Sequence, residues 1–197
     1  SETSGGGRLN DAFKIAAEQL DLTRPLGSHA YKTYAHALNT SFLKHKQHTG
    51  RSFNTGSTSH MSAVDTDGNM VALTYTLLSR FGSKVVLPKT GVIMNNAVSY
   101  FDPRPGYLTS IEPGKRVNSS NMCPMVCVRD NKAIFAVGAS GANQIIPCTM
   151  LVAAFMLDFG MSIEEAFNTP RIDAGGRETI RVDPLIGDKI LAELKEE

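Results

Sequence analysis

The stretch GSTSHMSAVD, at residues 56–65, joins a polar segment to the first predicted strand of the chain. Small and polar side chains dominate residues 47–59, which is typical of an exposed, flexible linker. The first predicted strand runs from Met61 to Asp65 and the second from Met70 to Leu77. Asp67-Gly68 between them supplies the positive φ of a tight turn. The sequence therefore predicts an antiparallel hairpin over residues 61–77, directly behind the linker.

A second hairpin is predicted around Arg-Asp-Asn-Lys at residues 129–132. Its strands would run over residues 125–128 and 133–137. Between the two hairpins lie passages rich in Pro and Gly, at 101–106 and 112–116, which predict loops. Loops at strand ends are where binding and catalytic residues usually lie.

Helices are predicted on both sides of these hairpins. Apolar residues recur at helical spacing in three segments, at residues 9–20, 28–46 and 145–159. Ser162 and Glu165 have the spacing of a capping box that opens a fourth helix, and Pro170 ends it. The order of helices, strands and helices predicts a layered α+β fold in which helices cover a largely antiparallel sheet.

Composition excludes several classes of protein. With 42% hydrophobic residues and a net charge of +1 over 197 residues, the chain can form a full core and offers no charged surface for nucleic acid or an anionic membrane. The longest apolar run, Cys148 to Leu157, is about half of a membrane span. The first seven residues do not resemble a signal peptide, and no phosphate loop, metal cluster or cofactor motif is present in the sequence.

The three cysteines, Cys123, Cys127 and Cys148, do not have the spacing of a metal site. If residues 123–128 form a strand, the first two lie roughly 13 Å apart, too far for a disulfide. We therefore expect buried free thiols.

Several ordered blocks resemble the small subunit of the gamma-glutamyltransferases, a family of N-terminal nucleophile hydrolases. The blocks span about 130 residues in the family's order. They are Thr58 to Asp65, Asp67 to Asn69, Thr74 to Leu77, Phe81 to Ser83, Thr90 to Asn96, Pro113 to Arg116, Gly138 to Gly141 and Leu157 to Met161.

The resemblance implies a four-layer αββα fold and an autocatalytic cut between Ser57 and Thr58. Residues 1–57 would be the tail of a large subunit with its processing linker, and residues 58–197 the small catalytic subunit. The implied partners are that large subunit, from the same precursor, and a small-molecule amide substrate. Whether such heterodimers assemble further stays open.

The cut has a chemical purpose. A free α-amino group has a pKa of about 8, so Thr58 as a new N-terminus can be both nucleophile and general base. The resemblance assigns Thr76 to orient the Thr58 hydroxyl, and the backbone N–H groups of Gly141 and Ala142 to an oxyanion hole. Ala142 replaces a family glycine. We expect His60 to point into packing.

On the substrate side, Ser120 and Asn121 match two family serines that hold a substrate carboxylate. Leu78, Ala97 and Tyr100 match the Asn, Gln and Asp that hold the α-ammonium of a gamma-glutamyl group. An ammonium buried there would lack partners, which is costly. The sequence therefore predicts an altered acyl group.

Three alternatives remain open. The first is gamma-glutamyl transfer or glutathione hydrolysis, which is the family's usual chemistry. The second is hydrolysis of a carboxylate-bearing amide without an α-amino group, as in oxamate amidohydrolase. The third is a non-catalytic fragment that serves as a binding or structural module.

Overall fold

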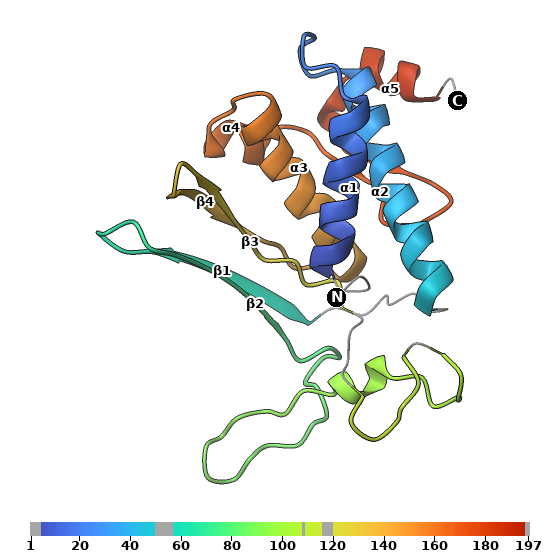
Figure 1. Cartoon of the computed structure of the whole chain (residues 1–197), viewed down its shortest axis with the longest axis vertical. Coiled ribbons are helices and arrows are strands. Elements are labelled where there is room, and N and C mark those ends of the chain that lie inside the picture. Colours follow the sequence, from blue (N-terminus) through green and yellow to red (C-terminus); the bar gives the residue numbers. More distant parts are fainter. Residues whose placement is uncertain (1–4, 50–56, 108, 116–119, 196–197) are drawn as a thin grey trace.

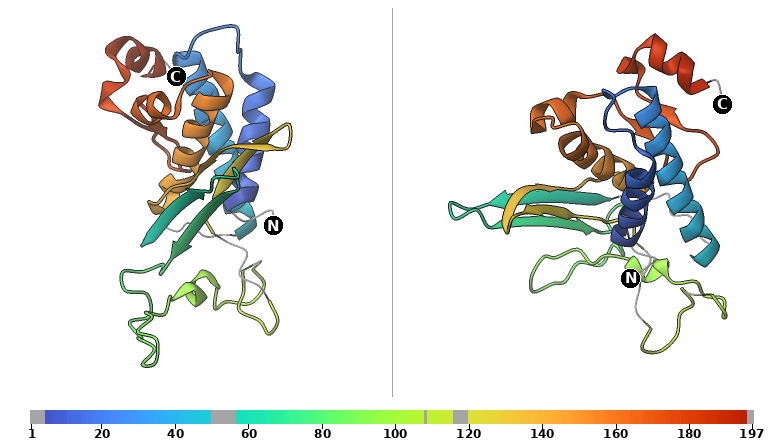
Figure 2. Two further views of the ribbon diagram at one scale, coloured as in Figure 1. Left: turned by 90° about the vertical axis from the view of Figure 1, so that its left-hand side faces the viewer. Right: turned by 45° about the horizontal axis from the view of Figure 1, so that its top comes forward.

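The computed structural model describes residues 5–49, 57–107, 109–115 and 120–195, with the backbone alone described at 45–49. A layer of helices covers the hairpin β3–β4, and the hairpin β1–β2 lies on the far side of β3–β4 (Figures 1 and 2). Residues 77–107 and 109–115 extend beyond the hairpins as long loops with one short 3₁₀ turn, Ala97–Tyr100. The chain thus has the predicted α+β architecture.

Five helices and six strands make up the described part of the chain. The helices are α1 (Gly5–Gln19), α2 (Ser28–Thr49), α3 (Ile145–Asp158), α4 (Ile163–Asn168) and α5 (Asp188–Lys195). The strands are β1 (Thr58–Val64), β2 (Met70–Thr76), β3 (Met125–Arg129), β4 (Lys132–Val137), β5 (Ile172–Asp173) and β6 (Arg181–Val182).

Both predicted hairpins are confirmed. β1 pairs antiparallel with β2, and Thr58 lies opposite Thr76. The Asp65 carboxylate accepts hydrogen bonds from the Asp67 and Asn69 backbone N–H groups at 3.0 and 2.9 Å, which closes the first turn. In the β3–β4 turn, two consecutive residues have positive φ, as a two-residue hairpin turn requires.

The core lies between the helices and the inner hairpin. α3 is apolar on nearly all sides, and ten consecutive positions from Ile145 are almost all buried between α1, α4 and β4. The ring of Phe155 meets Tyr31 of α2 edge-on, with centroids 6.2 Å apart. Ser162 and Glu165 form the predicted capping box at the start of α4.

Three predicted boundaries are wrong. α1 begins at Gly5 rather than Leu9, because the glycine packs flat against the backbone of Asn121 and Met122, where a Cβ would overlap. α2 runs on to Thr49, into the predicted linker, since no Gly or Pro interrupts it there. β1 begins at Thr58 rather than Met61, because backbone pairing with β2 reaches that far. Residues 50–56 of the predicted linker lie outside the described residues.

The three cysteines are free thiols, as expected, but only Cys123 is fully buried, whereas Cys127 and Cys148 are half-buried. Burial raises the pKa of Cys123 to about 11, so this thiol is protonated at neutral pH. Within the described ranges, no helix combines the length and the apolar character that a membrane span needs.

The two hairpins meet at a glycine. A Cβ added at Gly138 would overlap the imidazole ring of His60, and Ser62 Oγ lies 3.4 Å from the Ala136 carbonyl oxygen. His60 also contacts the hydroxyls of Thr74 at 2.8 Å and Ser62 at 3.0 Å, and burial lowers its pKa. The expectation that His60 points into packing is confirmed.

Replacing Gly138 by Ala should therefore push the hairpins apart. Because the site is well packed, we expect the free energy of unfolding to fall by about 1–3 kcal/mol, measured by urea denaturation. Gly27→Ala is a matched control, since its new Cβ would meet other atoms only at 3.6 Å or more. Adding His60→Ala to Gly138→Ala should recover part of the loss, and no recovery would rule out this overlap as the cause.

Candidate active site

The Thr76 hydroxyl lies between the two groups that a self-cleavage would join. Thr58 Oγ1 donates to Thr76 Oγ1 at 3.1 Å, and Thr76 Oγ1 donates to the Ser57 carbonyl oxygen at 3.1 Å. Thr76 also accepts a hydrogen bond from the Leu78 N–H at 2.9 Å. One hydroxyl thus contacts both the candidate nucleophile and the carbonyl of the Ser57–Thr58 peptide bond.

The Ser57 carbonyl oxygen has a second donor. The Leu77 N–H, one residue past the end of β2, lies 3.3 Å from it. The same oxygen thus accepts from the Leu77 backbone and from the Thr76 side chain. Two donors on one carbonyl oxygen stabilise negative charge that develops there. This pairing depends on Thr58 lying opposite Thr76 in the β1–β2 ladder.

The loop at residues 141–143, called here the 141–143 loop, has an unusual backbone. Gly141 has φ 119° and Ala142 has φ 56°. The left-handed conformation at Ala142 costs about 1–2 kcal/mol for a residue with a Cβ, so surrounding contacts must hold it. In the described part of the chain, no group accepts a hydrogen bond from the Gly141 or Ala142 N–H. Within the described ranges both N–H groups thus lack an acceptor, as the expected oxyanion role requires.

The contacts between the hairpins indicate where this loop should lie relative to Thr58. Ser62 faces Ala136, and two residues earlier His60 faces Gly138. Side chains two residues apart on a strand share a face. If the same step continued beyond β4, residue 140 would lie level with Thr58, so we expect the 141–143 loop to lie near Thr58.

Two of the three expected amine-pocket positions lie together. Asn96 accepts from the Ser79 N–H at 3.0 Å and donates to Ser79 Oγ at 2.9 Å, which joins the neighbours of Leu78 and Ala97. Leu78 is 5% exposed, so its apolar side chain is buried. Its φ of 69° is left-handed, a conformation that Asn tolerates better than Leu.

The other three expected substrate positions lie around Arg8 of α1. Arg8 Nη2 donates to the Ser120 carbonyl oxygen and to Asn121 Oδ1, both at 2.6 Å. Its charge also acts on Tyr100, which is buried beside it. The Asn121 amide donates in turn to Asn143 Oδ1 at 2.9 Å. Ser120 is half-buried and its hydroxyl accepts from the Met122 N–H at 3.1 Å.

Arg8 and Asn143 are functional candidates that the sequence patterns missed. Arg8 lies four residues before Ala12, on the face of α1 that also buries Leu9 and Ala16. A charged residue on the buried face of an amphipathic helix is a usable signal, because it must find polar partners inside. Asn143 carries no signal of its own beyond its place after Ala142.

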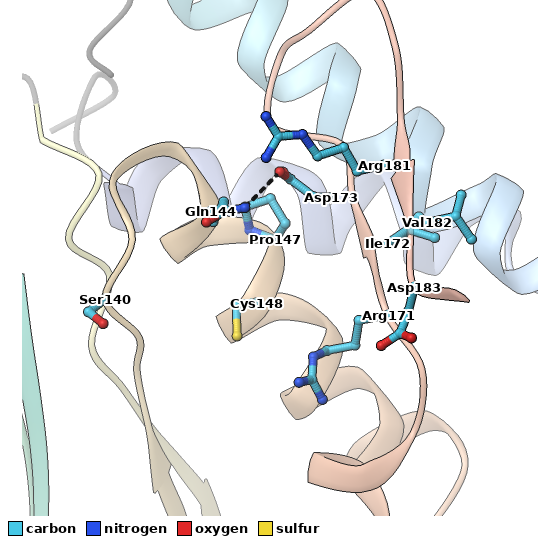
Figure 3. Close-up of a pocket in the computed structure, with 10 residues that line it drawn as sticks. All are labelled: Ser140, Gln144, Pro147, Cys148, Arg171, Ile172, Asp173, Arg181, Val182 and Asp183. Carbon is cyan, nitrogen blue, oxygen red and sulfur yellow. Dashed lines mark hydrogen bonds between the residues drawn. The ribbon is translucent and has the colours of Figure 1, made fainter. Parts of the chain in front are cut away.

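A separate pocket of about 360 Å³ opens between α3 and the β5–β6 pair (Figure 3). Ser140 and Gln144, on either side of the 141–143 loop, line one side of it. Two of its charged groups have structural partners: Arg171 donates to the Phe167 carbonyl oxygen at 2.8 Å, and Asp173 accepts from Gln144 at 3.2 Å. Neither Thr58 nor Thr76 lines this pocket.

Among the residues in the described ranges, no three His, Cys, Asp or Glu side chains gather as a metal site would require.

Comparison with known proteins gives one family over most of the chain. The family described as Gamma-glutamyltranspeptidase matches residues 15–197. The Acylase ACY 1 proenzyme of Pseudomonas sp. (strain SE83) is 41% identical over 115 residues, which cover 58% of this chain and 20% of that protein. The Glutathione hydrolase proenzyme of Bacillus subtilis (strain 168) is 32% identical over 139 residues, covering 71% of this chain and 24% of that protein.

A solved structure supports the fold. The cephalosporin acylase from Bacillus halodurans aligns over 98% of this chain and 41% of its own, with a TM-score of 0.69 and 19% identity. At that identity the likeness extends to the fold alone. The chain spans about a fifth to a quarter of the length of the two curated relatives described above.

Replacing Thr76 by Val in the complete precursor tests the bridging hydroxyl. Val keeps the side-chain shape but removes the contacts to Thr58 and Ser57. Two hydrogen bonds of about 1 kcal/mol each predict processing about 10–100-fold slower, followed as the appearance over time of a species whose mass begins at Thr58.

Thr76→Ser, which keeps the hydroxyl, should process nearly normally. Thr74→Val is the matched control, because Thr74 lies on the same face of β2 and its hydroxyl bonds only to His60 within the described ranges. Equal slowing by Thr74→Val and Thr76→Val would mean that strand packing, and not the bridge, governs the cut.

Proposed function

The chain belongs to the gamma-glutamyltranspeptidase family, and from that premise we propose that it forms the C-terminal part of an N-terminal nucleophile amide hydrolase or acyltransferase. The observation that carries this proposal is the Thr76 hydroxyl, held between Thr58 Oγ1 and the Ser57 carbonyl oxygen. A structural module has no need for a hydroxyl aimed at a specific peptide carbonyl.

The first step of the proposed mechanism is self-cleavage. Thr58 Oγ1 attacks the Ser57 carbonyl carbon, an ester forms, the C–N bond breaks, and the hydroxyl proton passes to the freed nitrogen. The Leu77 N–H and the Thr76 hydroxyl stabilise the charge on the Ser57 oxygen during this step. Water then hydrolyses the ester, which leaves Thr58 as an N-terminal residue.

The second step uses the new terminus. The free amino group of Thr58, with a pKa of about 8, accepts the hydroxyl proton as the oxygen attacks a substrate amide carbon. The N–H groups of Gly141 and Ala142 stabilise the oxyanion, and each such donor is worth about 3–4 kcal/mol of barrier. An acyl-enzyme forms as the amine leaves, and water or another amine then releases the acyl group.

The proposal includes two subunits from one precursor, residues 1–57 ending the large one and residues 58–197 forming the small one. The relatives described above are named proenzymes, which fits a precursor that is cut. The outer face of β1–β2 supports the need for more chain. Its apolar side chains are 47–58% exposed. They are Met61, Val71, Leu73 and Tyr75. We assign this face to the missing half of the four-layer sandwich.

For the substrate, we propose an amide whose acyl group has a carboxylate and no α-amino group. Leu78 is buried and apolar where the family has an ammonium ligand, and Tyr100 lies beside the positive charge of Arg8. An ammonium at this place would lack acceptors and would be repelled by Arg8. One relative, 41% identical over 115 residues, is named an acylase.

Gamma-glutamyl chemistry is the second candidate, favoured by the similarity to a glutathione hydrolase. It requires that the upstream subunit supply a carboxylate in place of the absent ligands.

Thr58→Ala in the complete precursor should abolish both processing and amide hydrolysis, because the same hydroxyl acts in each step. Thr58→Ser should retain part of both. Intact mass and an amide assay measure the two outcomes. If Thr58→Ala is still cut after Ser57, or still turns over substrate, the mechanism is wrong; a wild-type precursor that is never cut would favour the non-catalytic module.

Substrate choice is tested with the processed enzyme on oxamate, glutaryl amides and a gamma-glutamyl anilide. Each lost hydrogen bond to a charged group costs about 1.5–3 kcal/mol, so we expect kcat/KM for the gamma-glutamyl compound to be at least about tenfold lower than for the best amine-free amide. Efficient turnover of the anilide alone would identify an ordinary gamma-glutamyl enzyme.

A further inference from the structure

Arg8 is a cation buried in α1 that has no counter-ion among the described residues. Arg8 is 3% exposed, and no carboxylate within the described ranges pairs with its side chain. Burial lowers its pKa to about 10, so the guanidinium stays protonated at neutral pH. The guanidinium lies over the Phe42 ring, 5.0 Å from the ring centroid. Among the described residues, the Arg8 Nε has no hydrogen-bond partner. Such a costly group calls for an explanation.

Among the described residues, the only side-chain acceptor of Arg8 is Asn121 Oδ1, at 2.6 Å. A side-chain amide can be turned either way round, and the partner on one side decides which end faces the other. Because the Arg8 charge attracts Oδ1, the Asn121 Nδ2 must face Asn143. There it donates to Asn143 Oδ1 at 2.9 Å. The reverse orientation would set two acceptor oxygens against each other.

Asn143 follows directly on the two backbone donors of the proposed oxyanion hole. It is 8% exposed, and Gly175 packs so closely against its carbonyl that an added Cβ would lie 3.1 Å from that oxygen. Of the preceding residues, Ala142 has a positive φ that strains a residue with a Cβ, so it needs support from outside the loop. The Asn121 amide supplies such support from the side chain of Asn143.

We propose that Arg8 is a positioning residue for the oxyanion hole: it orients Asn121, which holds Asn143 and with it the 141–143 loop. The proposal rests on the proposed function. It also assigns a role to the part of the chain upstream of the cut, because Arg8 would act on the loop from the other subunit. Gly5, one turn before Arg8, packs against the Asn121 and Met122 backbone and strengthens this contact.

The test uses the complete precursor with Arg8→Met, which keeps the length of the side chain and removes its charge. For molecules shown by intact mass to be processed, kcat on the best amide of the panel should fall about 10–100-fold, with KM changed less than about threefold. Arg8→Lys should recover part of kcat, because one nitrogen, Nη2, makes both Arg8 hydrogen bonds.

Two further variants separate positioning from stability. Ser41→Ala removes a 2.8 Å hydrogen bond to the Arg8 backbone carbonyl without touching its side chain, so it should lower Tm and leave kcat unchanged. Asn143→Ala should lower kcat as Arg8→Met does, and it serves if Arg8→Met does not fold. Combining Arg8→Met with Asn143→Ala should lower kcat no further than Asn143→Ala alone.

Hydrogen exchange of peptides covering 138–144 gives a readout independent of activity. Arg8→Met should speed exchange there and leave the middle of α3 unchanged. If the wild-type enzyme does not turn over amides, the proposed function is wrong. Hydrogen exchange would still show whether Arg8 holds the 141–143 loop in place. Unchanged kcat and unchanged exchange in Arg8→Met or Asn143→Ala, or additive losses in the double variant, would overturn the positioning role.

Discussion

The proposed site depends on one hydroxyl, that of Thr76, which bonds at once to Thr58 Oγ1 and to the Ser57 carbonyl oxygen. This arrangement exists only in one register of the β1–β2 hairpin, since a slip by one residue would turn every side chain to the opposite face. The Asp65 carboxylate helps to keep that register by closing the turn with the Asp67 and Asn69 backbone. A turn at the far end of the hairpin thus determines the geometry at the cut.

Layering explains why the rest of the chain is needed. β3–β4 lies between the helices and β1–β2, and His60 against Gly138 sets how the two hairpins meet. From that contact we expect the 141–143 loop to lie near Thr58, and we propose that α1 supports the loop through Arg8 and Asn121. Nucleophile, proposed oxyanion donors and upstream segment are therefore coupled through packing, although they are far apart in sequence.

At the expected substrate positions, the backbone conformation suits the family's residues, but the side chains differ from them. Leu78 has a left-handed conformation that suits Asn, yet its side chain is apolar and buried. Ser79 and Asn96 still tie its neighbourhood to that of Ala97. Backbone donors, unlike side-chain ligands, are unaffected by substitution. They can therefore keep the reacting carbonyl in place while the acyl group that the site accepts changes.

The sequence by itself determined the hairpins, the capping box at Ser162 and the family blocks, because these depend on local turn chemistry and on residue order. It also pointed to Thr58 and Thr76, whose contact the structure contains. Only the tertiary structure decided that β1 begins at Thr58, that α1 begins at Gly5, and that Arg8 reaches Asn121 across 113 residues of sequence. These features come from backbone pairing and close packing between distant segments, which no local pattern of side chains encodes.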